Sequence, residues 1–303
     1  MMVASKPSAA TGVLWMLLSC ALLAGVAALG RYAALAGVPT FQTVFLRLVF
    51  AIVAFLPLLS VRGLELLRTE HLPLYILRVF VGLFGMTTWF AALSYVTVGE
   101  LTAIGFLAPI FGTVGAVFIL RELVGWRRWT ATFVGFLGAL IILRPGTNEI
   151  DIGIWLAIAA AFGMAMSSIL IKTLTGKDDP DKVVLIALSM QAPVALIPAL
   201  FVWQPISLHL WIVFAGMGLC GMLGHITLTR AFRAADASVV MSLEFARLPF
   251  AVLYGFALFG ELIDVWTWIG AGVIFAAALY TARRERQKRA VVTAGPTPTA
   301  ADT

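Results

Sequence analysis

Long apolar runs separated by short charged or Pro/Gly-containing connections organise this chain. Each run is continuously apolar over roughly 20 residues, which favours membrane-spanning helices over barrel strands, whose apolar positions alternate. The first run is too long for a signal-peptide core and lacks a small-residue cleavage site, so we expect it to be retained. The predicted helices cover residues 13–36, 41–59, 72–93, 100–120, 126–143, 152–171, 182–203, 208–231, 238–259 and 265–282.

The distribution of lysine and arginine gives these helices a direction. With the N-terminus in the cytoplasm, the outer connections carry only Arg31 and Arg144, and the inner loops and tails carry most of the remaining basic residues. This asymmetry places both termini in the cytoplasm and requires an even number of spans. The net charge of +6 therefore reflects membrane topology and does not indicate nucleic-acid binding.

Composition narrows the class further. The chain is 61% apolar and 12% charged, whereas a soluble domain is about half apolar and a quarter charged. Its 303 residues leave room for about ten spans and for no soluble catalytic domain. Cys20 and Cys220 fall inside apolar runs and give no disulfide framework. We therefore predict an all-α membrane protein.

An internal repeat is visible in the sequence. FILRELVGWRRWTATFVGFLGAL in the first half aligns with ALFGELIDVWTWIGAGVIFAAAL in the second, which pairs Glu122 with Glu261 and Trp129 with Trp268. Five helices per repeat is an odd number, so the second copy enters the membrane inverted, as in alternating-access transporters. We predict ten transmembrane helices as two inverted five-helix repeats around a central cavity. The predicted units are a cytoplasmic tail (1–10), the first repeat (11–146), the second repeat (147–285) and a disordered cytoplasmic tail (286–303).

Three motifs carry a family resemblance: Pro39 followed by Arg47 (PTFQTVFLR), Pro109 before Glu122, and Pro249 before Glu261. Over residues 10–285 the chain resembles the drug/metabolite transporter superfamily in its ten-helix EamA form, and most of all the YddG-type aromatic amino-acid exporters. The resemblance implies secondary transport of amino acids by alternating access, in the direction of export, in the bacterial inner membrane. Arg47 is not duplicated, because Leu188 stands at the corresponding position.

Polar or ionisable side chains inside the spans, with two neighbouring aromatic residues, are the candidates for a substrate site, because polar groups are costly at membrane depth. They are Arg47, Trp89, Phe90, Gln191, His225, Glu244 and Arg247. An arginine suits an anionic group such as a carboxylate, and Glu244 suits an amine. Alternatively, Glu244 and Arg247, which share a helix face, satisfy each other and only tie helices together.

The other candidates have alternatives of the same kind. His225 is either a proton relay or a hydrogen-bonded packing residue, and Trp89 and Phe90 form either an apolar wall for the substrate or ordinary packing. Arg78 lies near the cytoplasmic end of its helix and is expected to extend to the surface. Pro109 and Pro249 are candidate hinges. Glu122 and Glu261, at helix ends, are expected to fix the following loops.

Motif absences exclude other classes. The sequence has no HExxH, GxSxG or GxxxxGK[ST] motif, so we expect no enzyme activity, no ATP-driven pumping, no metal and no cofactor. The expected partners are a small-molecule substrate and the lipid bilayer, without nucleic acid, and a two-repeat chain can function as a monomer. Efflux of hydrophobic cations or toxic metabolites stays open as an alternative, and a channel is the alternative of another class.

Overall fold

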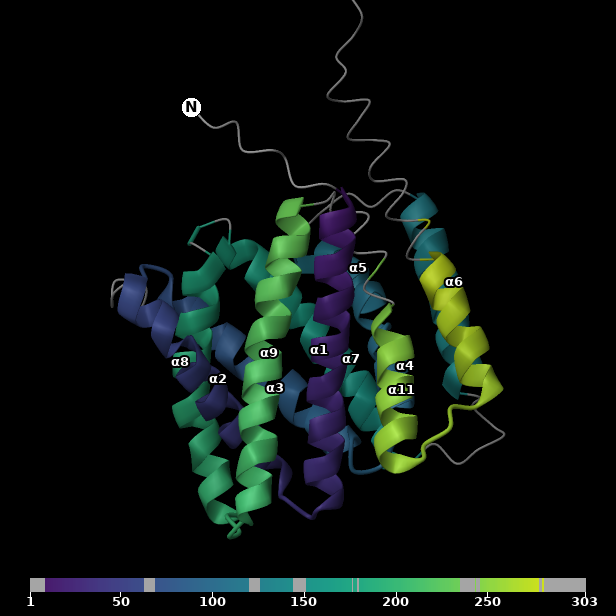
Figure 1. The fold of residues 1–303 in the computed structure, drawn as a ribbon. Helices are drawn as coiled ribbons and strands as arrows, with labels where there is room; N and C mark the ends of the chain where they lie inside the picture. Colours follow the sequence, from purple (N-terminus) through teal and green to yellow (C-terminus); the bar gives the residue numbers. More distant parts are fainter. Residues whose placement is uncertain are drawn as a thin grey trace, which may run out of the picture.

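A computed structural model describes residues 9–62, 69–119, 126–143, 151–175, 177–178, 180–234, 243, 246–277 and 280. These residues form helices joined by short connections (Figure 1). The first half contains α1 (Ala9–Leu35), α2 (Thr40–Arg62), α3 (Leu72–Ala92), α4 (Val98–Gly105), α5 (Ala108–Ile119) and α6 (Trp126–Leu143). The second half contains α7 (Ile152–Thr175), α8 (Pro180–Phe201), α9 (Leu208–Ala234), α11 (Arg247–Phe259) and a further helix, Val265–Ala277.

Six described helices are long and apolar enough to cross a membrane: α1, α2, α3, α7, α8 and α9. Large apolar side chains cover outward-facing surfaces of this bundle; Phe80 is 60% exposed and Leu200 is 62% exposed. Such exposure suits a lipid environment, because lipid does not penalise apolar surface as water does. The expectation of an all-α, multi-pass membrane protein is confirmed.

The two halves of the chain pack into one another. α1 lies beside α9 (Figure 1), α3 packs against α7, and α2 packs against α8. The first helix of each half thus contacts the third helix of the other half, and the two second helices contact each other. A two-fold relation between similar halves produces this pattern. Buried apolar residues from both halves join in one continuous cluster.

Small residues allow the paired helices to approach closely. A Cβ atom added to Gly163 of α7 would lie 2.6 Å from the Cα atom of Gly85 on α3. On the other pair, a Cβ atom on Gly224 of α9 would lie 2.8 Å from the side chain of Leu23 on α1. Because lipid supplies no hydrophobic force between helices, such close packing is a main source of their association.

The fourth predicted helix is divided into two. α4 ends at Gly105 and α5 begins at Ala108, and between them the amides of Phe106 and Leu107 donate to carbonyls three residues earlier. Pro109 explains the break: it has no amide hydrogen, and its ring clashes with the carbonyl four residues earlier, which belongs to Gly105. The sequence predicted one helix with a kink here, whereas the structure has a local interruption.

Candidate substrate site

Arg47 lies inside the bundle, about 10 Å from the start of α2 by helical rise. Its Nη1 donates to the sulfur of Met86 on α3 at 3.1 Å, and its Cζ lies 5.8 Å from the ring centroid of Phe90. Its Nε is buried and has no hydrogen-bond partner among the described residues. The guanidinium also faces α9, since Nη2 lies 3.8 Å from where a Cβ on Gly221 would be. A soft sulfur and an aromatic face are weak partners for an arginine, which leaves this cation open to a ligand.

Gln191 lies near the middle of α8 and is only 6% exposed. Its amide lies against Gly82 of α3, where an added Cβ atom would collide with Nε2 of Gln191. The hydroxyl of Ser167 on α7 lies 3.9 Å from the same Cβ position. Within the described residues the Gln191 side chain makes no hydrogen bond. A buried amide without hydrogen bonds is unusual and requires an explanation.

One face of α3 connects these two polar groups. Gly82, which contacts Gln191, and Met86, which contacts Arg47, are four residues apart and so share a helix face about 6 Å apart along its axis. Phe90 continues the same face one turn further toward the C-terminal end of α3. Arg47 and Gln191 therefore approach the same stripe of α3 from α2 and α8.

His225 borders an internal space. It lies deep within the protein, and the positive charges of Arg47 and Arg247 act on it electrostatically. Its side chain is nevertheless exposed, although the neighbouring Gly221 and Gly224 on α9 are buried. An exposed side chain enclosed by helices faces a cavity. Since Gly221 is one turn away on the same face of α9, this cavity adjoins Arg47.

The structure brings together four of the seven predicted site residues: Arg47, Phe90, Gln191 and His225. Trp89 points elsewhere, because its ring packs against Gly105, where an added Cβ atom would lie 3.1 Å from Cζ3. For Trp89 the arrangement favours helix packing.

Arg247 is half-buried and begins α11, and Pro249 lies in the first turn of that helix. The structure thus places Pro249, like Pro109, near the start of a short helix. Glu244 lies outside the described residues. Its expected pairing with Arg247 stays a prediction.

The charge at membrane depth has one sign in the described helices. Among the acidic and basic side chains, the charged Arg47 and Arg78 and the histidine His225 lie at least six positions from both ends of their helices. All three are basic types. A site of this charge attracts anionic or electron-rich ligand groups and repels cations.

Sequence reasoning missed Gly82, Met86, Ser167 and Gly221. Glycine and methionine are common in membrane helices, so none of these residues differs from its surroundings in the sequence. The spacing of Gly82, Met86 and Phe90 at four-residue intervals was the available signal. It becomes meaningful only once α2 and α8 are known to face α3.

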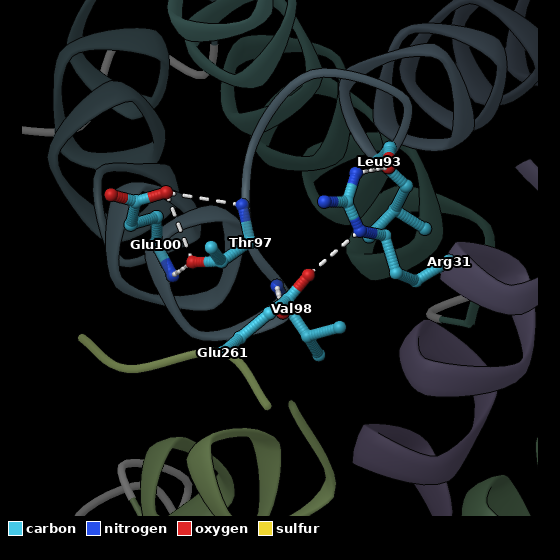
Figure 2. Close-up of polar contacts among 6 residues, drawn as sticks. All are labelled: Arg31, Leu93, Thr97, Val98, Glu100 and Glu261. Atoms are coloured by element: carbon cyan, nitrogen blue, oxygen red, sulfur yellow. Dashed lines mark hydrogen bonds and ion pairs between the residues drawn. The ribbon is translucent and has the colours of Figure 1, made fainter. Parts of the chain in front are cut away.

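A second polar cluster joins the two halves at the opposite end of α1 from its N-terminus (Figure 2). Nε of Arg31 donates to Oε1 of Glu261 at 2.8 Å, and another Arg31 nitrogen donates to the carbonyl of Leu93. The amide of Val98, the first residue of α4, donates to Oε2 of Glu261 at 3.0 Å. Glu261 thus ties α1 and α4 to the end of α11, a structural role between helices, whereas the sequence predicted contacts to the loop that follows it.

Next to this cluster, α4 begins with a capping box. The amide of Glu100 donates to the Thr97 hydroxyl at 3.2 Å, and the Thr97 amide donates to Glu100 Oε2 at 3.0 Å. Figure 2 shows both bonds beside the Arg31–Glu261 pair. Amide groups that the first helical turn leaves unpaired are satisfied here.

At the other end of the bundle, Asp178 joins the α7–α8 connection to α3. It accepts hydrogen bonds from Thr69 at 2.9 Å and from the Tyr75 hydroxyl at 3.0 Å, and Lys182 lies 3.1 Å away. Burial alone would raise the pKa of Asp178. The hydrogen bonds from Thr69, Lys182 and Tyr75 outweigh that effect and hold the pKa below its usual value.

Arg78 differs from the expectation that it extends to the surface. It is 8% exposed, and its Nη1 donates to the carbonyl of Val183 near the start of α8. The physical reason is that a nearby backbone carbonyl satisfies the guanidinium without full solvation.

An apolar depression of about 480 Å³ lies between α2, α3 and α8. Exposed side chains such as Phe84 and Ile197 line it, and no charged residue does. This depression is therefore distinct from the polar site around Arg47.

Comparison with known proteins assigns a family. Both halves of the chain, residues 10–144 and 151–283, match the model of the EamA-like transporter family. A riboflavin transporter of Vibrio cholerae is 34% identical over 281 residues, covering 91% of this chain and 94% of that protein. An S-adenosylmethionine uptake transporter of Rickettsia prowazekii is 29% identical over 277 residues, with the same coverage of 91% and 94%. A crystal structure with 14% sequence identity shares the fold, with a TM-score of 0.63 over 92% of this chain and 98% of the other.

These relatives correct one expectation and confirm others. They are named for riboflavin and S-adenosylmethionine, so the narrower resemblance to YddG-type exporters, with its amino-acid substrate and outward direction, is not supported. The two repeats and the broader superfamily are confirmed, and so is the expectation that the chain is not an enzyme. This multi-pass membrane protein belongs to the EamA-like transporter family.

Proposed function

We propose that this chain is a secondary transporter that carries riboflavin, or a closely related flavin, across the bacterial inner membrane. The observation that carries the proposal is Arg47, a cation at membrane depth whose side chain contacts a sulfur atom and an aromatic ring and has no stronger partner among the described residues. The likeness to the Vibrio cholerae riboflavin transporter, at 34% identity over nearly the full length of both chains, supplies the substrate class.

The charge of the site supports riboflavin over the other substrates considered. Riboflavin is neutral and presents carbonyl oxygens and ring nitrogens that accept hydrogen bonds. S-adenosylmethionine carries a sulfonium and an ammonium group beside one carboxylate, which gives it a net positive charge, and hydrophobic drug cations are positive as well. The positive charge of Arg47 disfavours these cations, because like charges repel strongly where water is scarce.

Alternating access is the mechanism we propose. The exchange of neighbours between the halves, with α1 on α9 and α3 on α7, supports two inverted repeats with a cavity between them. The distribution of lysine and arginine supports both termini in the cytoplasm. The break before Pro109, and the place of Pro249 in the first turn of α11, support these residues as hinges. Substrate bound near Arg47 would then be exposed to one side of the membrane at a time.

Counterflow in proteoliposomes tests the function. Purified protein is reconstituted into liposomes, with riboflavin supplied either inside or outside the vesicles. Exchange across the membrane is followed by flavin fluorescence, with and without a pH gradient. We expect saturable riboflavin counterflow, with little competition from S-adenosylmethionine, amino acids or tetraphenylphosphonium. Saturable S-adenosylmethionine or amino-acid exchange without riboflavin exchange would contradict the proposal, and large unitary currents would indicate a channel.

A further inference from the structure

The Gln191 side chain is largely buried, and its amide has no hydrogen-bond partner among the described residues. It sits near the middle of α8, is 6% exposed, and makes no hydrogen bond among the described residues. Burying an unpartnered amide is unfavourable, so a group of this kind persists where something outside the chain satisfies it.

The surroundings of Gln191 keep this amide in one place. Gly82 leaves the space that the amide occupies, since any Cβ atom there would collide with Nε2. The Ser167 hydroxyl lies within 4 Å of the same position, from α7. The Gln191 amide of α8 is therefore packed against α3, beside Ser167 of α7.

Arg47, on α2, contacts α3 at Met86, which lies one helical turn beyond Gly82 on the same face of α3. The two side chains differ in what they offer. A glutamine amide presents donors and an acceptor side by side, whereas an arginine presents donors only. A ligand that satisfies both needs a planar edge with an N–H beside a carbonyl, and a further acceptor a few ångströms away.

We propose that Gln191 recognises the cyclic imide edge of the flavin ring, with its N3–H and an adjacent carbonyl, while Arg47 binds another acceptor of the same ring system. Gly82 acts as a positioning residue, because it makes room for the amide. This inference rests on the proposed flavin transport, and it names the part of the flavin that the protein recognises. It predicts selection for the pyrimidinedione edge over the ribityl chain.

Binding of three flavins to the purified protein tests this assignment. Riboflavin has both features, lumiflavin keeps the imide but lacks the ribityl chain, and N3-methylriboflavin keeps the chain but has no imide N–H. For the unmodified protein we expect riboflavin and lumiflavin to bind similarly, and N3-methylriboflavin to bind about 10- to 100-fold more weakly, as loss of a buried hydrogen bond implies. Fluorescence quenching in lipid nanodiscs measures all three.

Two variants locate the discrimination. Gln191→Met keeps the side-chain volume and removes both hydrogen-bonding groups, so riboflavin and N3-methylriboflavin should then bind within about threefold of each other. Gly82→Ala displaces the amide and should also reduce the ratio of the two dissociation constants, that of N3-methylriboflavin to that of riboflavin. It serves as the test variant if Gln191→Met does not fold. Gln42→Met is the matched control: Gln42 is also buried, but its amide already donates to the Gln204 carbonyl at 2.8 Å and accepts from the Gln204 amide at 3.1 Å. That variant should lower stability and keep the full ratio.

The outcomes separate this inference from the proposed function. If the unmodified protein binds none of the three flavins, the proposed function fails. If it binds riboflavin and N3-methylriboflavin equally, or if Gln191→Met and Gly82→Ala keep the full discrimination, flavin transport stands and the role of Gln191 is wrong.

Discussion

Arg31 and Arg47 are both half-buried arginines of the first two helices, yet their surroundings differ completely. Arg31 pairs with the Glu261 carboxylate and donates to the Leu93 carbonyl, so its charge and its donors are satisfied by the protein. Arg47 has the sulfur of Met86 and a nearby aromatic ring, and its Nε is bonded to nothing in the described structure.

The difference teaches how to separate structural from functional polar groups in a membrane protein. A satisfied charge stabilises the arrangement of helices, and removing its partner destabilises the fold. An under-satisfied charge adds little to stability and is retained for a ligand. Each of the following changes tests one side of this comparison.

The largest expected effect is on stability, from Glu261→Ala. This change leaves Arg31 without its counterion and the Val98 amide without its acceptor, so we expect the free energy of unfolding to fall by about 3 kcal/mol. Equilibrium unfolding in mixed micelles measures it. Adding Arg31→Met to this variant should recover part of the loss, because the uncompensated charge is then removed. A loss below about 1 kcal/mol would mean that the cluster around Arg31 and Glu261 is not structural.

Arg47→Met should show the opposite behaviour. Riboflavin counterflow should fall by about 10- to 100-fold, because a charge-assisted bond to the substrate is worth roughly 1.5–3 kcal/mol, while unfolding should change little. Transport and unfolding are measured on the same preparation. Arg31→Met is the matched control and should lower stability rather than the transport rate of folded protein. Unchanged transport by folded Arg47→Met would remove this residue from the substrate site.

A smaller effect on stability is expected from Thr97→Ala, a change beside the cluster around Arg31 and Glu261. The change removes the hydroxyl that caps α4 and should lower the free energy of unfolding by about 1 kcal/mol. Flavin selectivity should be unchanged, because Thr97 is remote from Gln191. A change in flavin selectivity would show that the cluster around Arg31 and Glu261 and the substrate site are coupled.

The smallest expected effect is on the pH dependence of stability, through the cluster of Thr69, Tyr75, Asp178 and Lys182. Because hydrogen bonds hold the pKa of Asp178 below its usual value of 3.8, the ionised form stabilises the folded state above that value. This contribution should be lost as the pH falls through the lower, folded-state pKa. Asp178→Asn should remove that part of the acid dependence of unfolding, and an identical pH profile in the variant would contradict the role given to this cluster.

Much of the fold could be predicted from the sequence, because apolar run length dominates in lipid. Trp126–Leu143 was predicted to the residue, and the other described long helices agree within a few positions. The division at Gly105 was not predicted, although Pro109 marks its position. Whether a proline bends a helix or interrupts it depends on the packing around it, which the sequence does not display.

The site was predictable only in its polar members. Arg47, Gln191 and His225 stand out at membrane depth because their burial is costly. Their contact residues Gly82 and Met86 do not stand out in the sequence. Gly82 contacts Gln191 of the second half, and Met86 contacts Arg47 of another helix in the first half, so their roles depend on how the helices pack. Arg78 was misjudged for the same reason, since the carbonyl that satisfies it belongs to Val183.

The contact between Gly85 and Gly163 affects how the two halves can move. At this crossing the backbones of α3 and α7 approach each other, because neither glycine carries a side chain. Interlocked side chains resist sliding, because each must pass over a ridge of the other helix. The two glycines present no such ridge to each other, so they lower the local resistance to small rotations between α3 and α7, three residues along α3 from Gly82, which contacts Gln191.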